Sequence, residues 1–258
     1  MKRALAPVKE ELAIWRGSGR VLPFWWRDDD ATEPTPALDK LLGLAADLGA
    51  PLHLAVVPEP AGPDLANRLA AASRTMVIPH GWSHRNHAPA DEKKAEFGAH
   101  RSPGVMHGEI GRGWQRLQRV FGKQALPVFA PPWNRIAPAV VAALPALGLA
   151  AISTYLPRRE KHAAPGLLQV NTHVDPIDWQ KRRLLDPAAI AAVTVARLSA
   201  RRKRSVANEE PFGLLTHHLV HDDDIWSLTA AFVEIILESG AARFVSPLAE
   251  LGPSYRQD

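Results

Sequence analysis

Two groups of side chains in this 258-residue sequence are of the types that bind a divalent metal. Three adjacent aspartates, 28–30, follow the apolar run 24–26, and such carboxylates repel one another unless a cation lies between them. His80 and His84 are four residues apart, so on one helical turn or tight loop they face the same way. Two histidines and one carboxylate, with positions left for water, form a typical catalytic metal site. Each group alone also fits a solvated turn or a helix cap.

Three further clusters follow apolar segments. The turn Phe129–Arg135 contains two prolines that stiffen its backbone, and a rigid turn can aim an N–H at a developing oxyanion. Asp175–Trp179 offers two acids and an aromatic ring, suited to orienting a catalytic group and forming a cleft wall. His217 ends the apolar run 214–216, where it is placed to act as a general acid. A polar turn or a packed histidine remains the alternative for each cluster.

The elements that must position these clusters alternate between strand and helix. We expect strands at 21–27, 51–57, 75–78, 126–129, 149–153, 167–170, 212–216 and 243–245, and helices at 7–16, 36–48, 63–73, 104–121, 137–147, 187–201 and 225–238. Such alternation predicts parallel β-α units, and seven or eight of them suit a closed or nearly closed barrel over residues 1–258 as one domain. The irregular stretches 84–103 and 171–185 each follow a strand, which places both on the carboxyl-terminal face of a barrel.

Composition excludes several classes of site. The chain has no cysteine, so it has no disulfide framework, thiolate zinc site, iron–sulfur cluster or cysteine nucleophile. The net charge of +4 weakly favours anionic partners. No run of 18 apolar residues occurs, so no membrane partner is expected. Charges at 9–11 interrupt any apolar signal core, which favours a cytoplasmic location.

The order of the five clusters resembles that of the polysaccharide deacetylase family, carbohydrate esterase family 4. The corresponding segments are Asp28–Asp29, His80–His84, Ala130–Trp133, Asp175–Trp179 and Leu214–His217. Five motifs in order are far more specific than any one of them. The resemblance implies an α/β fold with a distorted (β/α)7–8 barrel, and a divalent metal cofactor, most often zinc.

The resemblance also implies a role for each matching residue. Asp28 would be the general base, and Asp29, His80 and His84 would be the metal ligands. The backbone N–H of Trp133 would donate to the oxyanion, and His217 would be the general acid. Asp178 would be the supporting acid, and Trp179 would form the cleft wall.

Two departures from the family pattern leave alternatives open. The residue after the paired aspartates is usually small, commonly glycine, but here it is Asp30, so Asp29 and Asp30 are an alternative working pair. The arginine of the third motif, which contacts the base in the family, is replaced by Ala130. Arg27 or Arg135 is the candidate substitute, from proximity in sequence.

These residues predict hydrolysis of an N-acetyl group from an amino sugar or polysaccharide. A related hydrolase of another acyl amide or ester, and a non-catalytic sugar-binding barrel, are the alternatives. Nucleic acid is a less favoured partner, because the basic run 201–204 fits the solvated end of a helix. The histidines and aspartates of 217–224 are a candidate second metal site, but the aspartates fit better as the cap of the helix starting near Ile225.

Overall fold

The computed structural model describes residues 1–203 and 210–252. The helices are α1 (Ala6–Gly17), α2 (Pro36–Asp47), α3 (Pro63–Ala70), α4 (Pro103–Phe121), α5 (Pro138–Val141), α6 (Pro187–Arg202) and α7 (Asp223–Glu238). The strands are β1 (Leu22–Ala31), β2 (Leu52–Val56), β3 (Thr75–Pro79), β4 (Val128–Phe129), β5 (Ala151–Ile152), β6 (His162–Ala164), β7 (Leu167–Gln169), β8 (Ile177–Asp178), β9 (Arg183–Leu184), β10 (Phe212–Thr216) and β11 (Ala242–Phe244). The alternation of strand and helix that the sequence predicts is confirmed.

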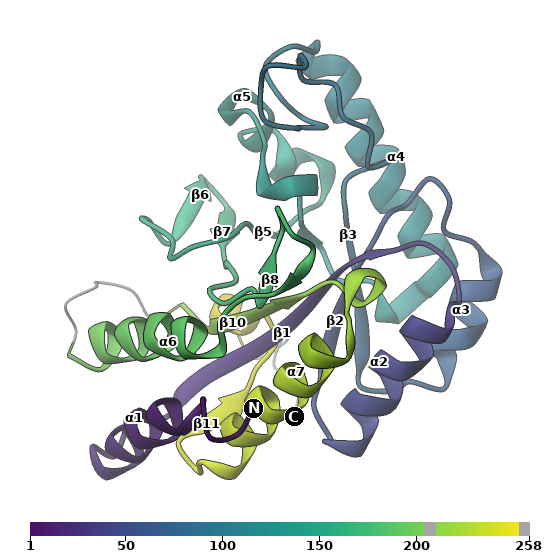
Figure 1. The fold of residues 1–258 in the computed structure, drawn as a ribbon. Helices are drawn as coiled ribbons and strands as arrows, with labels where there is room; N and C mark the ends of the chain where they lie inside the picture. Colours follow the sequence, from purple (N-terminus) through teal and green to yellow (C-terminus); the bar gives the residue numbers. More distant parts are fainter. Residues whose placement is uncertain (204–209, 253–258) are drawn as a thin grey trace.

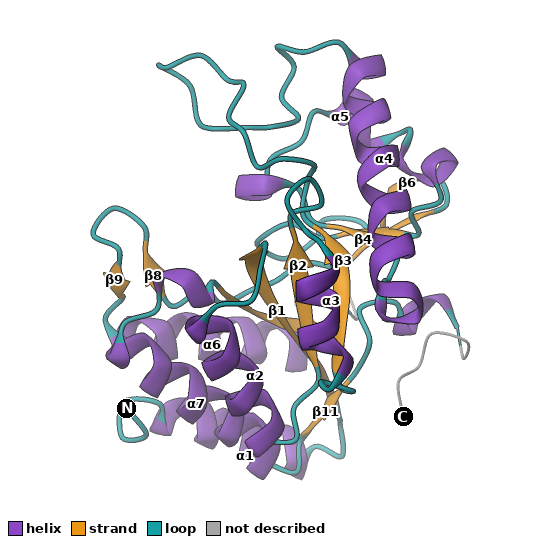
Figure 2. Cartoon of the chain, turned by 90° about the vertical axis from the view of Figure 1, so that its right-hand side faces the viewer, coloured by secondary structure: helices purple, strands orange, loops and turns teal. Residues whose placement is uncertain are grey.

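Parallel strands form the centre of the molecule (Figure 2). One sheet has the order β10-β1-β2-β3, with β11 also paired to β1, and a second has the order β4-β5-β7-β6. All the pairs in these sheets are parallel except β6 with β7, which is antiparallel. The carboxyl ends of the parallel strands therefore meet on one face, where a barrel carries its site.

Isolated bridges link the two sheets on both sides. His80 pairs with Ala130 and Val77 with Ala125 between β3 and β4, while Val174, beyond β7, pairs with Leu214 of β10. The strand ladders themselves do not run continuously around the described residues, because these links are single bridges. This is the distorted (β/α) barrel that the sequence predicts.

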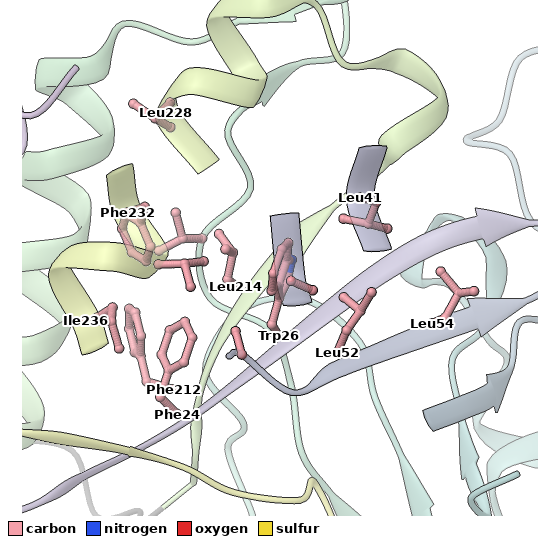
Figure 3. Close-up of a cluster of buried hydrophobic side chains, with 14 of the residues drawn as sticks. Phe24, Trp26, Leu41, Leu52, Leu54, Phe212, Leu214, Leu228, Phe232 and Ile236 are labelled. Carbon is pink, nitrogen blue, oxygen red and sulfur yellow. The ribbon is translucent and has the colours of Figure 1, made fainter. Parts of the chain in front are cut away.

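The largest apolar core lies between the sheet and the helices α2 and α7 (Figure 3). Phe24 of β1 packs edge-to-face against Phe244 and lies 6.5 Å, between ring centroids, from both Phe212 and Phe232. Burying one such ring contributes roughly 1.5–3 kcal/mol to folding. Strand β1 is thus anchored along its length, and its carboxyl end is a rigid support for the aspartates.

Three elements differ from the sequence-based expectation. β1 extends to Ala31 and includes all three aspartates, where a strand over 21–27 was expected. The helix expected at 137–147 is short, because after α5 the chain forms a separate 3-10 helix, Leu144–Leu147, that contains Pro145. The irregular stretch 171–185 contains the hairpin β8–β9.

Two helix ends bear on alternatives that the sequence leaves open. Asp222 caps α7, since its carboxylate accepts the N–H of Ile225 at 2.8 Å, as the cap interpretation predicts. Arg201, from the basic run, is buried and bonds to Glu210, so the expectation of a solvated helix end is wrong for this residue, while Arg202 pairs with Glu11 at 2.7 Å. Arg204 of that run lies outside the described residues. Across 1–203 and 210–252, none of the helices combines the length and apolarity needed to cross a bilayer.

Candidate metal centre and active site

A cavity of about 580 Å³ opens at the carboxyl ends of the strands. This volume lies within the range of roughly 300–1,000 Å³ that small-molecule sites occupy. Its walls come from β1, the two expected irregular stretches and the segments that follow β3, β4, β5 and β10. The lining residues are Asp29, Asp30, His80, His84, Lys94, Trp133, Asn134, Arg135, Tyr155, Asp175, Trp179, Arg182 and His217.

A bulge at the end of β1 decides which aspartates face this cavity. The register with β2 shifts between Asp28 and Ala31, and Asp30 has a φ of +78°. In a regular strand Asp29 and Asp30 would point to opposite faces. Because the bulge inserts a residue and turns the chain, both Asp29 and Asp30 line the cavity.

Asp30, His80 and His84 form the cluster that can hold a metal ion. Their ligand atoms lie within 4.8 Å of one another, and Asp30 Oδ1 is 3.1 Å from His80 Nε2 and 3.2 Å from His84 Nε2. The carbonyl of Ala130 lies 3.0 Å from His80 Nδ1, which directs Nε2 of that ring toward the cluster. Although burial opposes it, the two histidines hold the pKa of Asp30 well below its usual range.

The donor set fits a divalent metal. One carboxylate and two imidazoles suit zinc, and the cavity beside them leaves room for water and substrate. Asp30 Oδ1 is buried and, among the described residues, has no hydrogen bond of good geometry. The structure places Asp30, and not the expected ligand Asp29, against the two histidines.

Asp29 is held instead by a buried ion pair with Arg27. Arg27 Nη2 donates to Asp29 Oδ2 at 3.0 Å, and its Nε lies 2.9 Å from Oδ1. The same guanidinium donates to Asn134 Oδ1 at 2.8 Å and to Ser153 Oγ at 2.7 Å, so its position is fixed. Arg27 thus places a positive charge beside Asp29, which the apolar Ala130 cannot do. The other candidate, Arg135, donates to the carbonyl of Lys94 on the cavity wall.

Asp28 is fully buried and does not line the cavity. Its Oδ2 accepts Thr216 Oγ1–H at 2.6 Å and the N–H of His218 at 3.1 Å, while Oδ1 lies 2.5 Å from His218 Nδ1. Despite burial, His218 lowers the pKa of Asp28, and Asp28 raises the pKa of His218. This ion pair fixes the segment after β10. Asp28, the expected general base, thus has both carboxylate oxygens engaged by Thr216 and His218, outside the residues that line the cavity.

The loop between His80 and His84 is shaped by Gly81 and Glu96. Glu96 is fully buried, and its Oε1 accepts the N–H of Ser83 at 2.7 Å. Gly81 has a φ of +68°, and a Cβ there would lie 2.2 Å from Glu96 Oε2 and 2.6 Å from Pro132 Cγ. Only glycine therefore fits between these two residues. Glu96 was not among the residues expected from the sequence. The one signal available for it is that a charged residue stands between the apolar Ala95 and Phe97.

His217 lines the same cavity as His80 and His84. Its Nε2 lies 3.8 Å from Asp29 Oδ2, and the ring of Trp179 packs against it edge-to-face at 4.5 Å. Trp179 Nε1 donates to Asp175 Oδ2 at 2.9 Å, and burial raises the pKa of Asp175. Trp179 thus forms the cleft wall where the sequence places it.

Asp178, the expected supporting acid, does not line the cavity. Its Oδ1 accepts the N–H groups of Gln180 and Lys181 at 3.1 and 3.2 Å, so it shapes the turn between β8 and β9. Asp175, from the same motif, is the acid that lies in the cavity beside His217. The position of the supporting acid is corrected accordingly.

Trp133 and the remaining lining residues complete the site. Trp133 has a φ of +54°, and its ring centroid lies 4.4 Å from that of His84, which places its side chain next to the Asp30–His80–His84 cluster. Tyr155, Lys94 and Arg182 also line the cavity. The sequence analysis missed these three, because each lies in an irregular segment without a motif.

Comparison with known proteins gives a likeness of fold. No family model and no curated protein sequence matches the chain. A family 4 carbohydrate esterase from Streptomyces lividans, solved with acetate, has a TM-score of 0.56 and 15% identity, over 92% of this chain and 97% of that one. The Bc1960 peptidoglycan N-acetylglucosamine deacetylase has a TM-score of 0.54 and 19% identity, over 91% and 90%. A family 4 acetyl xylan esterase from Clostridium thermocellum, solved with a cobalt ion, has a TM-score of 0.50 and 16% identity, over 88% and 89%.

The chain therefore has the fold of the family 4 carbohydrate esterases, with many structural neighbours among polysaccharide deacetylases. The resemblance that its five motifs predict is confirmed at the level of the fold. At 10–19% identity across the neighbours compared, this chain is a divergent example of it.

Proposed function

We propose that this protein is a metal-dependent hydrolase that removes an N-acetyl group from an amino sugar or polysaccharide. The observation that carries the proposal is the convergence of Asp30, His80 and His84 on one cavity, which the Arg27-held Asp29 and His217 also line. A base, a metal-ligand set and an acid around one cavity are the parts that amide hydrolysis needs.

Asp30, His80 and His84 would hold the metal, for which we expect zinc. A divalent metal at this position would polarise the acyl carbonyl and lower the pKa of a water from about 15.7 toward 7. Asp29 takes a proton as the water oxygen bonds to the acyl carbon. The ion pair with Arg27 holds the Asp29 carboxylate at the cavity wall.

The Trp133 N–H is the proposed donor to the oxyanion of the tetrahedral intermediate, and one such donor is worth roughly 3–4 kcal/mol in the transition state. His217, as imidazolium, gives its proton to the amine nitrogen as the carbon–nitrogen bond breaks. Trp179 and Asp175 hold His217 at the cavity wall. The products are acetate and a free amino group.

Two alternatives remain as outcomes of the test. A hydrolase of another acyl amide or ester would use the same residues on a different acyl group. A non-catalytic barrel was suggested by Ala130, and a family 4 pseudoenzyme is among the similar structures. The Arg27–Asp29 ion pair argues against that alternative, because it supplies the missing positive charge beside the base.

The test measures zinc content and acetate release from an N-acetylglucosamine oligomer. We expect one zinc per chain and acetate release in the wild-type protein, and loss of both in His80→Ala. The matched control is His87→Ala, since His87 is exposed in the same loop and lies outside the cavity. The protein could bind zinc and release another acid from other acyl substrates, but release no acetate from acetylated glycans. That result would support a hydrolase of another acyl amide or ester.

A further inference from the structure

Three basic side chains line the cavity from separate segments. Lys94 comes from the irregular stretch after β3, Arg135 follows the turn that contains Trp133, and Arg182 lies in the turn between β8 and β9. Arg135 Nη1 donates to the carbonyl of Lys94 at 2.9 Å, so these two residues share one wall. Arg182 belongs to the hairpin of Trp179, which packs on His217. The cavity is therefore basic on two sides.

These three cations have no acidic partner within the part of the chain that the structure describes. By contrast, Arg101 pairs with Glu109 at 2.6 Å and Arg158 pairs with Glu250 at 2.7 Å. Unpaired cations around a concave site attract an anion from solution, because their charges add there.

The acidic residues of the cavity contact other partners and form no ion pair with these three cations. Asp29 is engaged by Arg27, and Asp30 faces the imidazoles of the metal-ligand cluster. Asp175 accepts the Trp179 indole N–H and the N–H of Ile177. A divalent cation bound at the cluster would add two positive charges to the cavity.

We propose that the substrate is an acylated amino sugar that itself carries an anionic group, a carboxylate or a phosphate. The proposal deepens the function proposed above and rests on it. Lys94 and Arg182 are exposed although they line the cavity, so the anion would bind at its rim while the acyl group reaches the Asp30–His80–His84 cluster. Guanidinium groups pair with carboxylate or phosphate through two parallel hydrogen bonds, and Lys94 adds a point charge.

The binding test compares sugars that differ by one charge. N-acetylmuramic acid and its methyl ester differ by a carboxylate charge, and N-acetylglucosamine 6-phosphate and N-acetylglucosamine differ by a phosphate. Titration calorimetry on the zinc-loaded protein should give a Kd at least about tenfold lower for one charged member than for its uncharged partner. The pair that shows the difference identifies the anion as carboxylate or phosphate. The preference should also shrink as salt rises from 50 to 500 mM, because exposed charges are screened.

Variants of the hairpin supply the matched control. Arg182→Gln should reduce the charged-to-uncharged preference about fivefold or more, and Lys94→Gln should reduce it less. Lys181→Gln removes the neighbouring cation, which lies outside the cavity and is 3.9 Å from Asp178, and should leave the preference intact. Both 181 and 182 are exposed, so neither change removes a core contact.

The outcomes separate this inference from the proposed function. Equal Kd values within both sugar pairs, or equal losses in Lys181→Gln and Arg182→Gln, would overturn the anion preference, even with acetate release intact. The protein could instead show a charge preference that depends on Arg182 but release no acetate from any of the four sugars. That result would support the anion site and overturn the deacetylase assignment.

Discussion

Replacing Asp28 with asparagine tests whether this residue is structural, as its contacts indicate. The carboxylate accepts three donors, Thr216 Oγ1–H, His218 N–H and His218 Nδ1–H, at 2.5–3.1 Å in a fully buried position. An asparagine keeps one acceptor oxygen and turns an NH2 toward donors. It also leaves the His218 imidazolium without its counter-charge.

Breaking a buried ion pair by removing one partner costs about 3–5 kcal/mol. For a chain of this size each kcal/mol shifts the melting temperature by roughly 2–4 °C, so Asp28→Asn should lower it by roughly 6–20 °C. The assay is thermal unfolding by circular dichroism, with acetate release and zinc content measured well below the transition. Asp29→Asn is the matched control, because it is the same change one residue later in the cavity.

The expected result is a large stability loss in Asp28→Asn with zinc and measurable acetate release retained. Asp29→Asn breaks the buried ion pair with Arg27, so it should also lower the melting temperature, but unlike Asp28→Asn it should abolish acetate release. An Asp28→Asn protein of wild-type stability that binds zinc but releases no acetate would refute the reasoning and return the base to Asp28.

Three further results are expected. Although burial opposes both shifts, the pairing lowers the pKa of Asp28 and raises that of His218 on folding. The pair therefore stabilises the folded state fully only above the unfolded carboxyl pKa of about 3.9 and below the unfolded imidazole pKa of about 6.5. The difference in unfolding free energy between wild type and Asp28→Asn, from urea titrations, should therefore peak between those pH values and shrink on either side; a difference that rises steadily to pH 9 would contradict the pairing. Gly81→Ala should weaken zinc affinity at least about tenfold, measured by competition with a chelator. The added Cβ would collide with Glu96, so the loop would have to move. An affinity equal to that of the wild type would show that the loop is not rigid. His217→Ala should slow hydrolysis of an N-acetyl substrate far more than that of an activated aryl acetate, since an activated phenol departs without protonation; equal losses would assign His217 a structural role.

Local sequence patterns predict much of the fold. The parallel barrel follows from the alternation of apolar runs and amphipathic segments, which depends on neighbours in sequence. The segments at His80–His84, Trp133, Trp179 and His217 were likewise found, since each directly follows a strand or lies on a predicted irregular stretch. In a barrel those positions share one face.

The register at the end of β1 was not predictable in the same way. It depends on a bulge that is set by pairing with β2, and a one-residue shift exchanges the faces to which side chains point. One local signal was available, because Ala31 is the small residue that should follow the paired aspartates if the pair is Asp29 and Asp30.

Contacts between distant segments account for the rest. Arg27 reaches Ser153 and Asn134, which are 126 and 107 residues away in the chain, and no local pattern encodes such a contact. Glu96 acts on the histidine loop from a stretch without regular structure. Asp178 was favoured over Asp175 by the motif alone, whereas the fold of the β8–β9 hairpin decides which acid faces the cavity.

The most direct test of the account is the zinc stoichiometry of Asp30→Asn and Asp29→Asn by elemental analysis of the purified proteins. Asparagine tolerates the positive φ at residue 30, so that change removes the charged ligand without straining the chain. The account predicts that Asp30→Asn loses most of its zinc, while Asp29→Asn keeps one zinc per chain and releases no acetate. Full zinc in Asp30→Asn together with a zinc-free Asp29→Asn would contradict it.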